Sequence, residues 1–476
     1  MNPRILLIHG GGLGNAGDNG QMLSALERLE RIFPNGEIVV GQMYESDDGH
    51  LIGKREHSST PHLFVNRQVW TSHTESESSS SAMHSVRRRF RVRRGRISTH
   101  IKKYINSRAH LRRIAEGLLS VVSLFRGGVF LFVLMVYKRL GLRLPLGVTG
   151  QKAIDTLISC DAVYCSGGGN LNDIWFHNEL IPRVVSYKAA AILDKPLVVS
   201  GQGVGPLESK LGKMLLRWSA RHALIFGCRD HSNSRDFLIR IGLCGSKVQS
   251  FGDDAFDLRN SSNNRVNEII RQEGIPSGHA RLVAVHIRLH NFTQDFTGRG
   301  ITVLASFLDR LVEEIDCIFA FVPITYARGS RLGDLRDAAA VKKRMRYRER
   351  VTLIDMHAYS PPDMKSLIGR CDALIGFSYH AWIFALSNGR PAFGLFDGEY
   401  FRLKSRGLYD WYGISNWLWD LNKFDEDEAT RIVLQTLADS DSVEAMLHST
   451  NSMIVRQIKT PAKELADALA SRGSIS

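Results

Sequence analysis

Two residues with complementary chemistry, Arg229 and His380, lie at the ends of apolar runs of the sequence. A guanidinium at a strand end offers a planar fork for a carboxylate or a phosphate. An imidazole can give and take a proton near neutral pH. Each residue also has an ordinary explanation, a surface ion pair of Arg229 with Asp230 and a structural role for His380. Their joint placement predicts a shared site for an anion and a proton transfer.

Further polar groups follow other apolar runs. Arg288 closes the run LVAVHIR, and Ser378 stands in the turn that leads to His380. Glu399 and Lys404 follow the run PAFGLF. The carboxyl ends of parallel strands meet at one edge of a sheet, so these side chains are expected near the same cleft.

Three glycine-rich segments also follow apolar runs, at 10–18, 166–171 and 200–206. Glycine allows a ligand to approach the backbone closely, and a helix N-terminus offers N–H donors to an anion or a sugar hydroxyl. The first segment contains G-x-G-x-x-G, a dinucleotide-binding pattern, but Asp18 would repel a pyrophosphate. At the start of a helix, the ordinary role of Asp18 is that of a negative N-cap. A nicotinamide oxidoreductase is therefore the last of the functions that we consider.

Apolar strand-like runs alternate with helical stretches, a pattern typical of parallel α/β sheets. The predicted strands are 4–9, 37–43, 162–166, 196–202, 223–229, 282–288, 317–324, 351–356, 373–377 and 391–396. We predict two doubly wound Rossmann-like domains that face a cleft. The first spans 1–259, the second spans 260–425, and helices follow at 426–476.

Composition and charge exclude several classes of protein. The chain has 476 residues, 43% of them hydrophobic, which excludes a wholly disordered protein. Its net charge is +14, but twelve Lys and Arg and no acid lie within 87–113, and the rest is nearly balanced. In that basic segment Phe90 and Tyr104 are the only Phe, Tyr or Trp residues, too few for a nucleic-acid stacking platform. We predict no nucleic-acid partner.

The basic segment belongs to an insertion at 72–145 that is Ser-rich, then polybasic, then apolar at 117–140. A membrane crossing is disfavoured, because strands of one sheet are predicted on both sides of it. Two interpretations stay open. Two short amphipathic pieces hinged at Arg126-Gly127-Gly128 would bind an anionic membrane surface together with the basic arm, or a buried helical hairpin would carry a solvated basic loop. The six cysteines form no C-x-x-C pair and the first residues read as a strand, so we expect a cytoplasmic protein, peripheral to the membrane in the first case.

Six segments, in this order, resemble landmarks of the polysaccharide pyruvyl transferase family. They are Asn15-Ala16-Gly17-Asp18, Gly167-Gly168-Gly169-Asn170-Leu171, Gly201-Gln202-Gly203-Val204-Gly205-Pro206, Arg229-Asp230 with Ser232, Asp253-Asp254-Ala255-Phe256, and Ser378-Tyr379-His380-Ala381. Ser378 stands where many members of the family have an arginine. In this respect the sequence resembles a branch of the family.

The resemblance implies a fold similar to the GT-B glycosyltransferases and transfer of a pyruvyl group from phosphoenolpyruvate to a sugar as a ketal. His380 would be the acid and Arg229 part of the catalytic clamp. The implied donor-binding residues are Arg229, Arg288, Ser378 and Lys404. The implied acceptor-binding residues are Asn15, Gly17, Asp18, Gly168, Asn170, Gln202 and Glu399. We expect no cofactor and no metal.

Two other functions stay open at this stage. A nucleotide-sugar glycosyltransferase would use a similar fold, and a membrane-associated scaffold would keep the fold without the chemistry. The identity of the sugar, its modified hydroxyls and the oligomeric state are also open.

Overall fold

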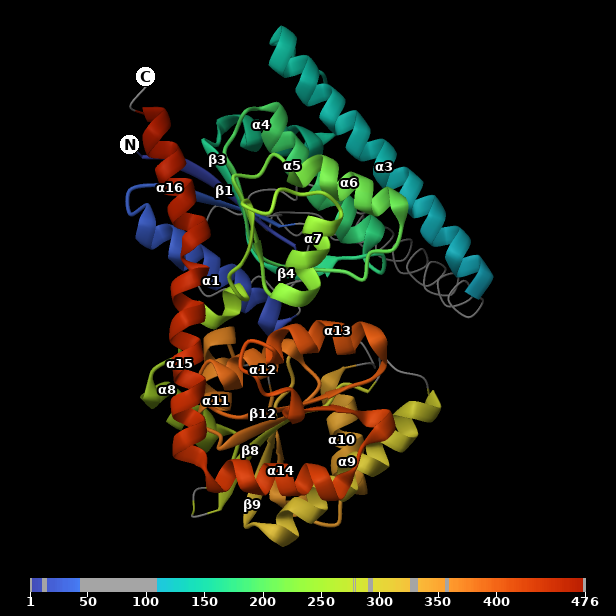
Figure 1. Cartoon of the computed structure of the whole chain (residues 1–476), viewed down its shortest axis with the longest axis vertical. Helices are drawn as coiled ribbons and strands as arrows, with labels where there is room; N and C mark the ends of the chain where they lie inside the picture. Colours follow the sequence, from blue (N-terminus) through green and yellow to red (C-terminus); the bar gives the residue numbers. More distant parts are fainter. Residues whose placement is uncertain are drawn as a thin grey trace, which may run out of the picture.

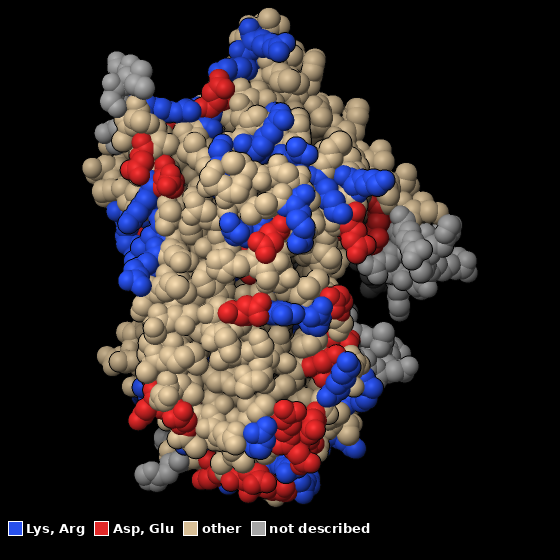
Figure 2. Space-filling model, viewed as in Figure 1, with Lys and Arg blue, Asp and Glu red and all other residues tan. Residues whose placement is uncertain are grey.

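The computed structural model describes residues 2–10, 15–42, 109–276, 278, 280–289, 294–325, 333–355 and 359–473. Two α/β domains, each built on a parallel sheet, are stacked along the long axis of the molecule (Figure 1). Lys and Arg dominate the face of the first domain that Figure 2 presents, whereas both signs of charge mix on the second domain.

The first sheet has the strand order β2-β1-β3-β5-β6-β7, with β4 paired to β5. Its strands are β1 (Arg4–His9), β2 (Glu37–Gln42), β3 (Ala162–Cys165), β4 (Gly168–Leu171), β5 (Leu197–Val204), β6 (Ile225–Cys228) and β7 (Val248–Ser250). In β1, Ile5 pairs with Ile38 on one side and with Ala162 on the other. Helices cover both faces of the sheet, which explains why β1 is apolar without alternation.

Helices of the first domain form a layer on each face of this sheet. The helix α1 (Ala16–Ile32) packs on the face that presents Ile5 and Leu7. The opposite face, which presents Leu6 and Ile8, is covered by α4 (Val148–Ser159), α5 (Ile181–Ile192), α6 (Lys210–Ala220) and α7 (Asp236–Arg240). The shorter turns are η2 (Phe176–Leu180), η3 (His231–Arg235) and η4 (Asp254–Asp257).

The second sheet has the order β10-β9-β8-β11-β12-β13. Its strands are β8 (Arg281–His286), β9 (Cys317–Phe321), β10 (Val351–Leu353), β11 (Ala373–Gly376), β12 (Ala392–Phe396) and β13 (Leu418–Asp420). The helices of this half are α8 (Asn263–Gln272), α9 (Gln294–Glu314), α10 (Asp334–Arg344), α11 (Pro361–Gly369), α12 (Tyr379–Leu386), α13 (Gly398–Tyr409), α14 (Glu426–Ala438) and α15 (Ser440–Ile458). Shorter turns are η5 (Arg348–Arg350), η7 (Ser415–Trp417) and η8 (Leu421–Lys423).

The last helix, α16 (Thr460–Gly473), returns to the first domain. Its residues Ala462, Leu465 and Leu469 join the core that Ile5 and Leu7 form with α1 (Figure 1). The helices predicted at the C-terminus therefore divide between the two domains. The chain crosses the domain junction twice, once before α8 and once between α15 and α16.

The apolar segment of the insertion forms one continuous helix, α3 (Ala109–Leu140). Both sequence-based interpretations of its shape are wrong, since it is neither two hinged pieces nor a hairpin. Gly127 does not bend the helix. A Cβ there would lie 2.6 Å from Val185 Cγ2, so the glycine allows α3 to pack closely on α5. Residues 72–108, with the Ser-rich part and most of the basic arm, lie outside the described residues.

The third glycine segment was predicted to be a loop. Contrary to that prediction, β5 continues through it to Val204. It does so because β4 supplies a new strand partner, with Gly168 opposite Gln202 and Leu171 opposite Val204. The sequence prediction missed β4, β7 and β13, each of four residues or fewer. Such short strands carry almost no periodic signal.

Candidate functional site

Arg229 directly follows β6 and is only 5% exposed. Its side chain passes over two glycines. A Cβ at Gly203 would overlap the Arg229 guanidinium, and one at Gly169 would lie 2.8 Å from Nη1. Trp411, from the second domain, donates its indole N–H to the Arg229 carbonyl at 2.9 Å. The glycine segments thus make room for a guanidinium at the domain junction.

His380 approaches the same junction from the second domain, in the first turn of α12. Its ring lies against Gly17 of α1, where a Cβ would overlap His380 Cγ. Asp18 Oδ1 lies 3.9 Å from His380 Nδ1. His380 Nε2 is buried and has no hydrogen-bond partner among the described residues. The imidazole therefore faces a carboxyl group of the other domain and keeps one nitrogen available.

Tyr379 links the cations of the two domains. Arg229 Cζ lies 4.3 Å from the centre of the Tyr379 ring, and Lys404 Nζ of α13 lies 5.6 Å from it. Across the part of the chain that the structure describes, neither cation forms an ion pair within 4.0 Å, and Arg229 Nε has no hydrogen-bond partner. Cations withdrawn from water are normally paired. Arg229 is buried, Lys404 is partly buried, and neither has a carboxylate within 4.0 Å among the described residues, so the pair is suited to bind an anion.

Arg288, the third predicted cation, lies two residues beyond β8 and forms an ion pair with Asp334. Its Nε and Nη2 donate to Asp334 at 3.0 Å each, and Nη2 also donates to Thr325 Oγ1. Asp334 in turn binds His286 at 3.0 Å. Asp334 fixes the position of Arg288, whose charge still acts on Asp18, Lys404 and His380.

These surroundings change the protonation states in the cluster. Burial, followed by the charges of Lys404 and Arg229, holds the pKa of His380 well below its usual value. Burial raises the pKa of Asp18 to about 7, and burial with the Arg229 charge lowers the pKa of Lys404 to about 7. We expected His380 to hold a proton near neutrality, as an ordinary imidazole does. The lowered pKa instead favours a neutral imidazole, and the groups of the cluster whose pKa lies near 7 are Asp18 and Lys404.

Buried space in the cluster is small. A cavity of about 40 Å³ opens beside the cations and is lined by Arg288, Phe377, Tyr379, Trp382, Leu395, Phe396, Phe401, Lys404 and Ser405. This volume holds about three water molecules.

The predicted acceptor-binding residues of the first domain already have partners within the fold. Asn15, and not Asp18, is the N-cap of α1, and its Oδ1 accepts from the Gly17 and Asp18 N–H groups at 2.8 and 3.2 Å. Asn170 Nδ2 donates to Glu179 at 3.2 Å, and Gln202 Nε2 donates to the Ser166 carbonyl at 2.5 Å. A Cβ at Gly168 would lie 2.7 Å from Arg183 Nη2. Their contact with an acceptor stays a prediction.

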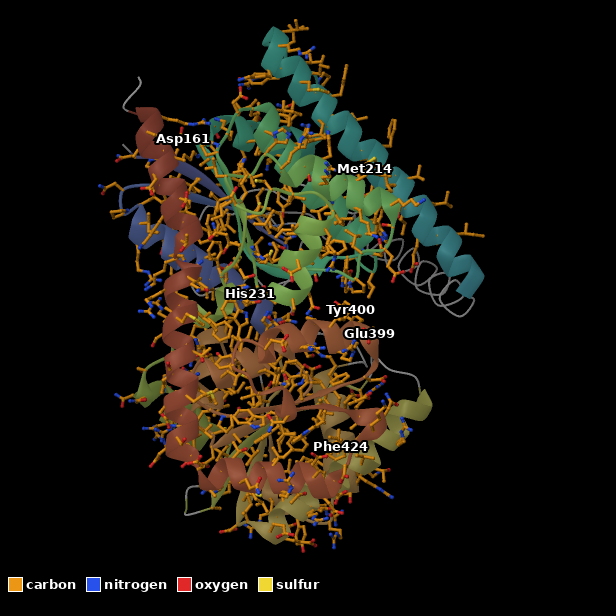
Figure 3. The ribbon with its side chains drawn as sticks, in the orientation of Figure 1. Asp161, Met214, His231, Glu399, Tyr400 and Phe424 are labelled. Atoms are coloured by element: carbon orange, nitrogen blue, oxygen red, sulfur yellow. The ribbon has the colours of Figure 1, made fainter. Side chains whose placement is uncertain are left out.

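The remaining two predicted residues differ in exposure. Ser378 is buried at the N-cap of α12 but makes no capping hydrogen bond with its side chain. Glu399 is exposed and pairs with Arg402 at 2.5 Å, outside the buried cluster. Figure 3 shows Glu399 and Tyr400 at the boundary between the domains.

Sequence reasoning did not single out Tyr379 or assign a role to the acidic pair at 253–254. Asp253 accepts from Gln21 Nε2 at 2.7 Å, and burial, opposed by Arg229, raises its pKa to about 6. Asp254 accepts from the Gly167 N–H at 2.6 Å and from Ser200 Oγ at 2.8 Å. Asp254 thus holds two glycine segments in place. The sequence offered one indication of this role, because the two aspartates belong to one of the six segments that resemble the family.

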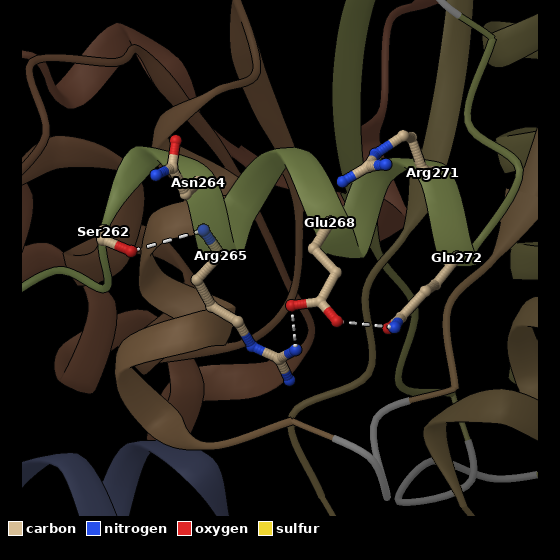
Figure 4. Close-up of a pocket in the computed structure, with 6 residues that line it drawn as sticks. All are labelled: Ser262, Asn264, Arg265, Glu268, Arg271 and Gln272. Carbon is tan, nitrogen blue, oxygen red and sulfur yellow. Dashed lines mark hydrogen bonds and ion pairs between the residues drawn. The ribbon is translucent and has the colours of Figure 1, made fainter.

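A larger surface pocket of about 730 Å³ lies along α8, away from this cluster (Figure 4). Its polar side chains bind one another. Arg265 and Gln272 donate to Glu268 at 2.8 and 3.0 Å, and Ser262 accepts from the Arg265 N–H at 3.3 Å. These contacts stabilise the helix and account for the polar lining without a ligand.

Comparison with known proteins adds a family and a fold. The model of the family described as "Polysaccharide pyruvyl transferase" matches residues 15–395. No curated protein matches the sequence. A putative UDP-N-acetylglucosamine 2-epimerase from Listeria monocytogenes aligns with a TM-score of 0.55 at 12% identity, covering 100% of this chain and 98% of that chain. HepE from Anabaena, in complex with UDP and glucose, aligns with a TM-score of 0.51 at 13% identity, covering 99% and 100%. The fold is therefore the two-domain Rossmann-like architecture of GT-B glycosyltransferases, as predicted.

Proposed function

This chain belongs to the polysaccharide pyruvyl transferase family, and on that premise we propose that it transfers a pyruvyl group from phosphoenolpyruvate to a sugar. The acceptor would be a polysaccharide or a lipid-linked glycan, and the product a cyclic ketal. One observation carries the proposal. Among the described residues, Arg229 and Lys404 have no carboxylate partner and lie beside Asp18 and His380, so an anion and a movable proton would meet there.

Donor binding would use the two unpaired cations. Phosphoenolpyruvate carries a carboxylate and a phosphate, which match the fork of Arg229 and the point charge of Lys404. Arg288, held by Asp334, would add positive potential. A fixed set of cations in a site with little water stabilises the charge of the departing phosphate.

The proton steps would begin at the donor's methylene carbon. Its double bond takes a proton to become a methyl group, which leaves an oxocarbenium-like centre at the next carbon. One sugar hydroxyl adds there and releases its proton. The bond to phosphate then breaks, a second hydroxyl closes the ketal, and its proton leaves with the phosphate as hydrogen phosphate.

Asp18 and His380 would move these protons. The negative donor offsets the cations that lower the pKa of His380, so the imidazole can take the Asp18 proton and pass it to carbon. Asp18, then ionised, would accept a proton from the sugar through the same ring. No cofactor or metal enters this proposal.

A nucleotide-sugar glycosyltransferase is the second candidate. The supporting observation is the fold, since solved structures with the same architecture, such as HepE, hold UDP. A scaffold without chemistry is less well supported, because it would have no reason to keep these cations unpaired.

The two enzymatic candidates are separated by ligand-induced thermal shifts. We expect phosphoenolpyruvate to raise the melting temperature and UDP to leave it unchanged. Arg229→Ala should weaken phosphoenolpyruvate binding by about 30-fold or more, while the exposed Arg221→Ala serves as a matched control. Stabilisation by UDP alone would favour the glycosyltransferase.

Turnover would be followed by mass spectrometry of candidate lipid-linked glycans after incubation with phosphoenolpyruvate. The expected product carries the added mass of a pyruvyl ketal. His380→Ala should abolish it without lowering the melting temperature. An active His380→Ala protein would remove the proposed proton path. We further propose that the enzyme works in the cytoplasm, at the inner face of the cytoplasmic membrane.

A further inference from the structure

The helix α3 lies on the outside of the first domain and is fixed there by one of its faces (Figure 1). Gly127 and the buried side chains of Phe130 and Leu134 face α5. Ser123 Oγ donates to the His177 carbonyl at 3.0 Å, and Lys138 pairs with Asp194 at 2.7 Å. These contacts hold α3 along the domain surface.

The opposite face of α3 is apolar and uncovered. Leu118, Phe125 and Phe132 are 63%, 72% and 56% exposed, and their spacing of seven residues places them on one side of the helix. Other exposed apolar residues of α3 are Ile114, Val121, Val122, Val129, Met135 and Leu140. Together these nine residues form what we term the α3 stripe. A stripe of this length, in water, requires a partner.

Two contacts of the fold decide how the stripe could meet a membrane. By length and composition, Ile114–Leu140 could cross a bilayer. However, β2 and β3, which precede and follow α3 in the chain, both pair with β1. A crossing would also break the packing on α5. If the stripe meets a membrane, the helix would therefore lie in the plane of the membrane surface, with the stripe facing the acyl chains.

Charge around the stripe selects the kind of partner. Arg126 and Arg139 are exposed on α3, and Glu116 is its only acidic residue. The chain segment 87–113, which enters the helix, has twelve Lys and Arg and no acid. The face of the first domain that Figure 2 presents is also rich in Lys and Arg. Two copies of this chain would bring like charges together, whereas anionic lipid headgroups would neutralise them.

We propose that the α3 stripe inserts into the interfacial region of an anionic phospholipid bilayer, with α3 parallel to the membrane. Ile174 and Trp175 are also exposed, just before η2, whose His177 carbonyl accepts from Ser123 on the packed face of α3. If the proposed function holds, binding at the membrane surface would bring the protein to a lipid-linked acceptor. Membrane binding itself does not depend on activity.

Vesicle flotation of the full chain tests the proposal. Vesicles of phosphatidylcholine alone are compared with vesicles that also contain phosphatidylglycerol, at low and high salt. We expect binding to the anionic vesicles that salt weakens. The variant L118S/F125S/F132S should bind roughly tenfold less, because three exposed apolar side chains are lost. Leu224→Ser, an exposed leucine away from α3, is the control and should bind as the unchanged protein does.

The melting temperature and the mass in solution complete the test. The triple variant should melt as the unchanged protein does, since these side chains are exposed. Equal flotation of the triple variant and the unchanged protein, or no flotation of either, would overturn the proposal. So would a dimer that the triple substitution converts to a monomer without any vesicle binding, because the stripe would then be an interface between two copies.

Discussion

Gly17 is the residue on which the meeting of Asp18 and His380 depends. The imidazole occupies the space where a side chain at position 17 would lie, so a Cβ there would overlap His380 Cγ. Gly17→Ala should displace the ring and reduce kcat by about 100-fold, the usual effect of a misplacement of about 1 Å. Steady-state kinetics with phosphoenolpyruvate and an acceptor would measure it.

Gly20→Ala, one turn later in α1, is the matched control. A Cβ there meets the flexible end of Leu258 at 3.1 Å, so it should leave kcat close to normal. Equal kcat values for the two variants would contradict this view of the imidazole.

Lys404 makes donor binding sensitive to pH. Burial and Arg229 lower its pKa to about 7, so the side chain loses its charge as the pH rises through 7. Affinity for phosphoenolpyruvate should therefore fall between about pH 6 and 8. Lys404→Arg keeps its charge throughout this range and should show a smaller decline, which would come from ionisation of Asp18, whose pKa is also about 7. Calorimetric titration at the two pH values would measure the difference, and a parallel decline in the variant would assign the effect to another group.

Several site residues could be predicted from the sequence because they stand at strand ends. Arg229 and Arg288 closely follow strands, whereas His380 and Lys404 lie on the helices that follow β11 and β12. The charges of the three cations all act on His380. The direction of the shift in the His380 pKa could not be predicted, because it follows from burial and from cations of three separate segments. The role of Tyr379 depends on side-chain directions that no spacing in the chain encodes.

At the scale of elements, a buried ion pair connects α1 to the turn η4. Arg28 Nη1 lies 2.7 Å from Asp254 Oδ1, and both side chains are almost fully buried. Arg28→Ala should lower the free energy of unfolding by about 3–5 kcal/mol, because it leaves the Asp254 charge buried and unpaired. Urea denaturation would measure the loss.

Arg31, one turn along α1, provides the comparison. It pairs with Asp257 at 3.1 Å but is 58% exposed, so Arg31→Ala should cost at most about 1 kcal/mol. Similar losses in the free energy of unfolding for the two variants would show that the buried Arg28 pair contributes no more stability than the exposed Arg31 pair.

The element pattern was predicted well where strands are long and buried on both faces, as β1 and β8 are. It failed where tertiary contacts decide. The glycines at 127 and 128 favour a hinge in an isolated helix, but packing of Gly127 against Val185 keeps α3 straight. The strand β4 pairs with the end of β5, a contact that the spacing of residues in the chain does not indicate.

At the scale of the whole molecule, α16 fastens the two domains together. Leu465 is fully buried against the first sheet, although it follows helices of the second domain. Leu465→Ala should destabilise the protein by about 2–5 kcal/mol and make the first domain unfold at lower urea. Fluorescence and circular dichroism would follow the transition. The exposed neighbour Lys463→Ala should unfold as the unchanged protein does, and an equal loss in both variants would argue against a fastening role.

The close approach of His380 to Gly17 joins two groups of the proposed proton path that belong to different domains. Asp18 and His380 belong to different domains, and their side chains approach to 3.9 Å at a point where Gly17 has no side chain. On the proposed mechanism, the proton path would be complete only while the two domains are in contact. Any separation of the domains would interrupt that path, so the reactive cation derived from the donor would form only while the domains are together. This dependence would protect the cation from hydrolysis by bulk water.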